Sequence, residues 1–92
     1  MNKKRGNTMS YKMGEVVELK VGRSKFEVTI LDEGPVEIQN PYSGATCKLE
    51  PLAIGVYDLI KGAEMLGDYK TLRMTLDYFR KHWSAEYMTL LD

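Results

Sequence analysis

The sequence predicts an α+β domain in which an antiparallel three- or four-stranded β-meander is followed by an α-helical hairpin and a short C-terminal helix. Hydrophobic and polar residues alternate between residues 15 and 49, as in strands with one buried face. From Pro51 onward the hydrophobic residues recur with a helical period. A chain of 92 residues is long enough for one such domain and too short for two.

Four segments carry the strand pattern. Hydrophobic residues occupy alternate positions from Val17 to Val21 and again from Phe26 to Ile30, on either side of a break at 22–24. Two further strands are predicted near 36–38 and 46–49, because turn-forming residues precede each of them. Connections this short are typical of neighbouring antiparallel strands, so we expect one meander whose apolar face is covered by helices.

The first helix is predicted from Pro51 to Leu66. Proline is favoured at the first helical position, and Gly67 is a typical helix stop. One arc of this helix is apolar and is expected to face the core: Leu52, Val56, Leu59, Ile60, Ala63 and Leu66.

A second helix is predicted from about Tyr69 to Trp83, with Asp68 as its N-cap. Its apolar stripe has helical spacing and is expected to be buried: Tyr69, Leu72, Leu76, Phe79 and Trp83. Since only two residues join the helices, they should form an antiparallel hairpin. Ser84 can cap a short last helix that turns Tyr87, Leu90 and Leu91 inward.

Charge is unevenly distributed along the chain. Thirteen basic and thirteen acidic residues cancel overall, yet residues 1–14 carry a charge of +4. This segment has no hydrophobic periodicity, and we expect a disordered basic tail before a single domain of residues 15–92. The alternative is an arm that contacts nucleic acid or an acidic partner. The neutral total argues against a chain that holds nucleic acid by bulk charge alone.

Several short motifs after residue 40 suggest a family. They are Asn40-Pro41-Tyr42-Ser43-Gly44, Tyr57-Asp58, Lys61-Gly62, Leu66-Gly67-Asp68-Tyr69, Asp77, Phe79 and the ending Glu86-Tyr87-Met88-Thr89-Leu90-Leu91-Asp92. With these motifs the chain resembles a group of small uncharacterised tailed-bacteriophage proteins. The resemblance runs from Asn40 to the end and implies a phage origin and a place in the host cytoplasm of an infected bacterium. It implies no chemistry, since no activity is attached to the group.

Site chemistry is sparse in this sequence. The only conventional nucleophile and base are Cys47, expected to be buried in a strand, and His82, expected to be solvated near a helix end. No phosphate-binding glycine motif and no metal-ligand spacing occur, and no apolar run is long enough to span a membrane. We therefore expect no enzyme activity, no catalytic or metal-ligating residues and no cofactor.

Gly55 and Gly62 fall within the first predicted helix, where each costs about 0.5–1 kcal/mol relative to alanine. They lie seven residues apart and therefore share a face of the helix. A close approach of another backbone would compensate for them, and the second helix of the same chain is the expected neighbour. A partner subunit or a ligand is the alternative.

Apolar residues also occur on the predicted outer faces of both helices. Ile54 and Met65 lie opposite the core side of the first helix, near Asp58, and Met74 and Tyr78 form an i, i+4 pair on the second. Methionine and aromatic side chains suit the centre of an interface. We therefore expect these five residues to bind a partner, either a second copy of the chain or a host protein. Scattered exposure or cover by a terminal segment is the alternative.

The second helix also carries a candidate anion-binding face. Arg73 and Arg80 lie seven residues apart, with Lys70 and Lys81 nearby, although Asp77 lies between the two arginines. Such residues can hold a nucleotide or a nucleic-acid backbone, whereas a solvated helix face is the commoner meaning of such charges.

The sequence thus favours a small phage accessory protein that acts as a non-catalytic binding module through its helical face. The alternative is a nucleic-acid or nucleotide-binding protein that uses Arg73, Arg80 and the basic N-terminal tail. A structural component of the virion is a third reading.

Overall fold

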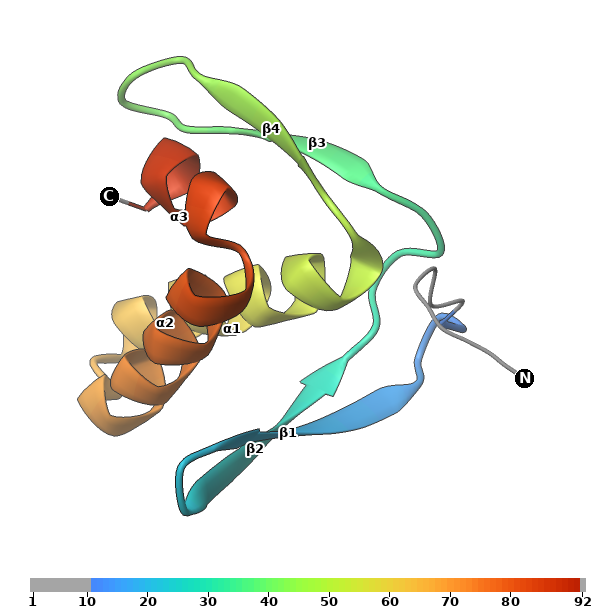
Figure 1. The fold of residues 1–92 in the computed structure, drawn as a ribbon, viewed down its shortest axis with the longest axis vertical. Helices are drawn as coiled ribbons and strands as arrows, with labels where there is room; N and C mark the ends of the chain where they lie inside the picture. Colours follow the sequence, from blue (N-terminus) through green and yellow to red (C-terminus); the bar gives the residue numbers. More distant parts are fainter. Residues whose placement is uncertain (1–10, 92) are drawn as a thin grey trace.

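The fold consists of two β-hairpins and three helices (Figure 1). A computed structural model describes residues 11–91. The elements follow one another as β1 (Val16–Val21), β2 (Ser24–Thr29), β3 (Val36–Gln39), β4 (Thr46–Leu49), α1 (Pro51–Leu66), α2 (Tyr69–His82) and α3 (Ser84–Leu90). This order confirms the predicted α+β class, with strands first and a helical hairpin and short helix after them.

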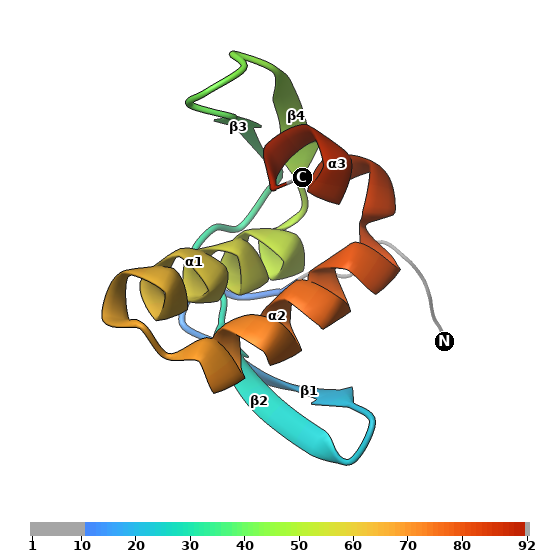
Figure 2. The same ribbon diagram turned by 90° about the vertical axis from the view of Figure 1, so that its left-hand side faces the viewer.

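The strands are divided between two antiparallel two-stranded sheets, a finer arrangement than the single meander expected from the short connections. β1 pairs with β2, with Val17 opposite Val28, and β3 pairs with β4, with Ile38 opposite Cys47. The two hairpins lie on opposite sides of the helices (Figures 1 and 2). The physical reason is that α1 packs against both β2 and β4, so helix packing replaces strand pairing between the hairpins.

The N-terminal half of α1 is the centre of the molecule. Every residue from Pro51 to Val56 is buried, as expected for a helix with neighbours on all sides. Gly55 permits the closest of these contacts, since a Cβ atom there would lie 2.3 Å from Val28 Cγ1 and 3.0 Å from the Thr29 carbonyl oxygen. The backbone that approaches Gly55 is therefore β2, and not α2 as we expected.

The other end of α1 is exposed. Leu66, expected in the core, is 84% exposed, because the helical hairpin extends beyond both β-hairpins (Figure 2). Gly67 ends the helix in the left-handed conformation with φ +71°, and its amide donates to the Glu64 carbonyl. The Asp68 side chain then caps α2 by accepting a hydrogen bond from the Thr71 amide at 3.2 Å, as predicted.

The hydrophobic core lies where α1 meets the two hairpins and the other two helices. Phe79 is its largest fully buried side chain. Besides Phe79, the apolar residues buried in this core are Leu19, Phe26, Val28, Ile30, Leu49, Leu52, Ala53, Ile54, Val56, Ile60 and Leu90. Each element except β3 supplies at least one of them, so the core joins both hairpins to the helices.

Part of the expected tail belongs to the domain. Tyr11 packs against the core, and the Gly14 amide donates a 2.8 Å hydrogen bond to the Ile30 carbonyl. The segment 11–14 is therefore part of the folded domain, contrary to the predicted boundary at residue 15, because Tyr11 supplies an apolar ring that the pattern of alternation does not reveal. The remainder of the predicted tail, residues 1–10, lies outside the described residues, as does residue 92.

Candidate binding surfaces

The predicted partner-binding face is not continuous in the structure. Ile54 is buried at 7% exposure, and Met74 and Tyr78 are half-buried and packed against the core. Tyr78 makes an edge-to-face contact with Phe26 of β2, with ring centroids 5.7 Å apart. The β1–β2 hairpin covers the side of the helices that a single sheet would have left open. Of the five expected contact residues, only Asp58 and Met65 are exposed.

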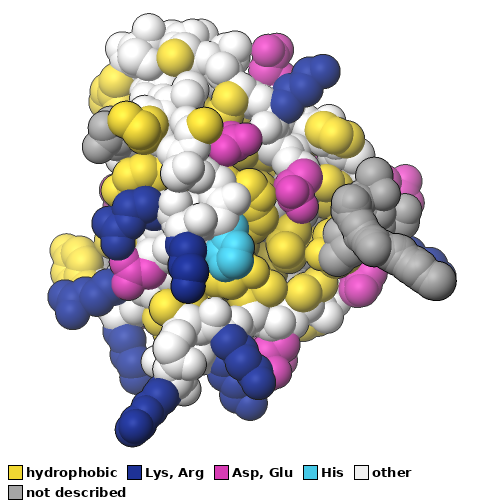
Figure 3. All heavy atoms as spheres, viewed as in Figure 1, with side chains coloured by type: hydrophobic (Ala, Val, Ile, Leu, Met, Phe, Trp, Pro, Cys, Tyr) yellow, Lys and Arg dark blue, Asp and Glu magenta, His cyan; other side chains and the backbone are white. Residues whose placement is uncertain are grey.

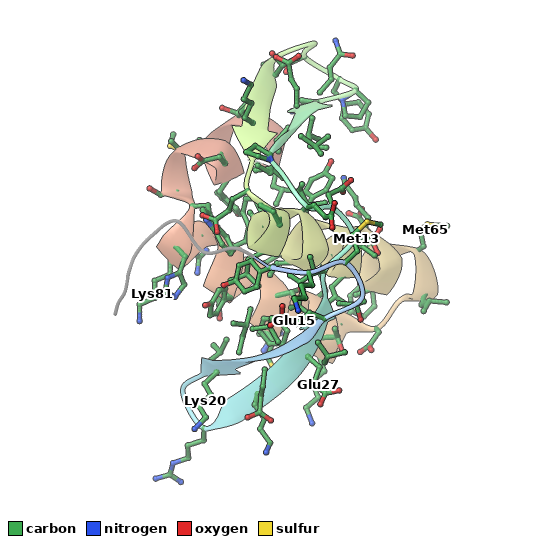
Figure 4. The ribbon with its side chains drawn as sticks, turned by 90° about the vertical axis from the view of Figure 1, so that its right-hand side faces the viewer. Met13, Glu15, Lys20, Glu27, Met65 and Lys81 are labelled. Atoms are coloured by element: carbon green, nitrogen blue, oxygen red, sulfur yellow. The ribbon has the colours of Figure 1, made fainter. Side chains whose placement is uncertain are left out.

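A different apolar surface is open to solvent at the tip of the helical hairpin. We call Met65, Leu66 and Tyr69 the hairpin tip; they are 86%, 84% and 71% exposed. Figure 4 shows Met65 projecting from the far end of α1, away from both β-hairpins. Leu66 and Tyr69 were predicted to be buried, and this prediction is wrong. Helical periodicity identifies which face of a helix is apolar, but it does not show how far along the helix other elements pack against that face.

A shallow groove lies beside the hairpin tip, between the end of α1 and the start of α2. Its volume is about 230 Å³ and its lining comprises Asp58, Leu59, Gly62, Ala63, Leu66, Asp68 and Thr71. No atom lies within 4 Å of the position that a Cβ of Gly62 would take, apart from its own helix backbone and chain neighbours. Gly62 therefore makes no close approach within the described chain, contrary to the expected packing against α2.

The predicted anion-binding residues are all exposed on one side of the molecule. Lys70, Arg73, Arg80 and Lys81 project from α2. The β1–β2 hairpin adds three further exposed basic residues: Lys20, Arg23 and Lys25. Figure 3 shows lysine and arginine side chains gathered at the lower left, over these two elements.

Acidic residues predominate elsewhere. Outside α2 and the β1–β2 hairpin, the described chain has nine acidic residues and three basic residues. Within those two elements it has seven basic and three acidic residues. Two of these three acids make salt bridges there, Glu18 with Lys25 at 3.4 Å and Asp77 with Arg80 at 2.7 Å. The folded domain is therefore polarised, although its sequence is nearly neutral.

Two hollows adjoin α2 on this basic side. The larger, of about 480 Å³, lies between α2 and the β1–β2 hairpin, and its lining comprises Val21, Ser24, Tyr69, Lys70, Arg73, Met74 and Asp77. The second, of about 330 Å³, lies between α2 and α3, and its lining comprises Tyr69, Leu72, Arg73, Leu76, Asp77, Arg80 and Tyr87. Because Tyr69, Arg73 and Asp77 line both hollows, the two adjoin along α2.

Cys47 and His82 are held in separate packing environments. Cys47 is half-buried on β4, and burial, with a smaller contribution from Glu86, raises the pKa of its thiol. A raised pKa lowers the thiolate fraction and hence the nucleophilicity of the sulfur. His82 stacks on Tyr78 with ring centroids 4.1 Å apart. Among residues 11–91, no three His, Cys, Asp or Glu side chains are grouped to hold a metal ion.

The turn between β3 and β4 is organised by Asn40. This side chain is 8% exposed; its Oδ1 accepts hydrogen bonds from the Tyr42 and Ser43 amides, and its Nδ2 donates to the Thr89 carbonyl at 2.9 Å. The Asn40–Gly44 motif therefore has a structural role, since it joins the turn to α3. Tyr42 at the turn is 95% exposed.

Comparisons with protein-family models, with curated proteins and with solved structures returned no match. The candidate surfaces therefore rest on the geometry of this chain alone. No helix within residues 11–91 has the length and apolar character needed to cross a membrane.

Proposed function

We propose that this protein is a non-catalytic binding module whose helical hairpin associates with a second copy of the chain. The observation that carries the proposal is the exposure of three large apolar side chains at one place, the hairpin tip. Transfer of such surface out of water is favourable by roughly 25 cal/mol per Å². A contiguous exposed apolar patch is typical of an interaction site, whereas single exposed apolar residues need no explanation.

Charge at the tip favours a second copy as the occupant. Glu64 lies next to the tip on α1, Asp68 at the N-cap of α2, and Lys70 in the first turn of α2. A two-fold interface presents the same surface from both subunits, so it requires a surface that is complementary to itself. Acidic and basic residues that flank an apolar centre make such a surface complementary to itself. The groove over Gly62 can also receive an apolar side chain from the second copy.

The biological setting of the proposal comes from the resemblance to small tailed-bacteriophage proteins. We propose on that basis that the protein acts as an accessory protein in the cytoplasm of an infected bacterium. A host protein that binds the same tip is the alternative occupant.

Sedimentation velocity over a series of protein concentrations tests the dimer. The wild-type chain should approach twice the monomer mass as its concentration rises. The Met65→Ser/Leu66→Ser double variant should remain a monomer with the thermal midpoint of the dilute wild-type chain, because a dimer would raise that midpoint with concentration. Met88→Ser is the matched control, because Met88 is also exposed, at 67%, but lies on α3. A wild-type chain that remains monomeric at every concentration contradicts the proposal.

A further inference from the structure

We infer that the two hollows along α2 form a binding site for single-stranded nucleic acid. The site extends along α2 to Arg73 and Arg80, beyond the hairpin tip, although Tyr69 and Lys70 belong to both surfaces. The site combines the two features that recognise unpaired strands without sequence preference, namely cations spaced along a track and an aromatic face open to the ligand.

The cations are placed where a phosphate backbone can reach them. Arg73 lines both hollows, Lys70 lines the first and Arg80 the second, so positive charge continues along α2 from one hollow to the other. Among the described residues, neither Lys70 nor Arg73 makes a salt bridge. Their charges are therefore available to a ligand, and arginine can bind a phosphate through two parallel hydrogen bonds.

The aromatic face is that of Tyr69. This side chain is 71% exposed and lines both hollows, next to Arg73. Val21 and Met74 provide apolar surface in the first hollow, and half-buried Tyr87 lines the second. Every base has a π-face that can stack on tyrosine, but a base in a duplex already stacks on its neighbours. The arrangement therefore favours an unpaired strand over a duplex.

The β1–β2 hairpin extends the positive field beyond the first hollow. Arg23 lies in its turn, between the ends of the two strands that place Val21 and Ser24 in the hollow. Lysine and arginine are the majority of charged residues on this side of the molecule (Figure 3). Asp77 opposes the field from the centre of the site and holds Arg80 in a salt bridge. Affinity should consequently be modest and strongly dependent on salt.

Fluorescence anisotropy with a labelled oligothymidylate tests the site at low and moderate salt. The measurement uses the Met65→Ser/Leu66→Ser background, so that self-association at the tip does not contribute. Arg73→Gln should weaken binding about tenfold and reduce the salt slope by about 0.7, which is the contribution of one phosphate contact on a single strand. Tyr69→Ala should also weaken binding by about tenfold, whereas Tyr69→Phe should retain it.

Charge controls separate a site from a general attraction. Asp77→Asn should tighten binding, because it removes the opposing charge and releases Arg80 from its salt bridge. Lys48→Gln removes one positive charge from β4, which lines neither hollow, and should leave the affinity nearly unchanged. If Lys48→Gln weakens binding as much as Arg73→Gln, or if a duplex or free mononucleotide binds as tightly as the oligonucleotide, the inference is wrong.

Discussion

At the scale of single residues, the two glycines of α1 have opposite surroundings although they lie on one face of the same helix. Gly55 faces β2, where Val28 is fully buried and the Thr29 carbonyl is part of the backbone, so neither neighbour can move aside easily. Gly62 faces open space. Only the first of the two therefore requires glycine for packing, and the second carries the usual cost of glycine in a helix.

This difference predicts opposite effects of the same substitution. Gly55→Ala should destabilise the fold by about 1–3 kcal/mol, as overpacking of a core does. Gly62→Ala should stabilise it by about 0.5–1 kcal/mol, because alanine restricts the unfolded chain and fits the helix. Urea unfolding of dilute protein, where any dimer has dissociated, measures both changes. A stabilising Gly55→Ala would show that β2 does not lie against α1 as described.

The sequence predicted the helical residues of α1 and most of its buried arc, but it did not predict the burial of Ile54 or the exposure of Leu66. Pro51 and Gly67 define the ends of the helix through local backbone chemistry, and such signals can be read without a structure. The burial of Ile54 reflects the packing of α1 against both hairpins and α2, and such tertiary contacts have no local signal. Met74 and Tyr78 are half-buried because they lie against the β1–β2 hairpin.

At the scale of elements, the β3–β4 hairpin depends on α3 for its position. Its two strands are only four residues each, and an isolated two-stranded hairpin is at best marginally stable in water. β4 packs against α3, and the Asn40 side chain joins the turn to the Thr89 carbonyl near the end of that helix. The one buried side chain of Asn40 thus provides hydrogen-bond partners for backbone groups of both the turn and α3.

Asn40→Ala should therefore destabilise the domain by about 1–3 kcal/mol, the usual cost of leaving buried polar groups without partners. Hydrogen exchange should also become faster at the amides of Tyr42 and Ser43, because both amides donate hydrogen bonds to the Asn40 Oδ1 in the wild-type chain. Tyr42→Ala is the matched control in the same turn, because an exposed side chain should change the free energy of unfolding by no more than about 0.5 kcal/mol. Equal effects of the two substitutions would contradict the role assigned to Asn40.

At the scale of the whole molecule, the helices separate the two β-hairpins, and this separation determines which surfaces remain open. Alternating hydrophobicity predicted four strands, but it did not predict that they form two separate sheets. The alternation within each strand is the same in one four-stranded sheet as in two hairpins. The basic residues of α2 could be predicted from helical spacing, whereas their proximity to Arg23 and Lys25 depends on the position of the β1–β2 hairpin. At the hairpin tip the exposure of Met65 was predicted, whereas that of Leu66 and Tyr69 was not, because helical periodicity does not show where along a helix its neighbours end.

Two tyrosines lie where the main parts of the molecule meet. Tyr11 precedes β1 and Tyr78 belongs to α2, and both pack against the core. Burial raises the pKa of each phenol above 10.0, and Glu50, the residue before α1, adds to the effect. The folded state therefore favours the neutral phenols, so their contribution to stability is complete below pH 10 and is lost as the pH rises through the folded-state pKa.

The double variant Tyr11→Phe/Tyr78→Phe should consequently lose less stability than the wild-type chain between about pH 8 and about pH 11, because phenylalanine has no proton to release. Urea unfolding at the two pH values measures this difference, and phenolate absorbance follows the titration directly. Tyr42→Phe removes a hydroxyl from the exposed β3–β4 turn and should behave as the wild type does. If the double variant loses as much stability as the wild type, burial of these phenols does not govern the alkaline unfolding of the domain.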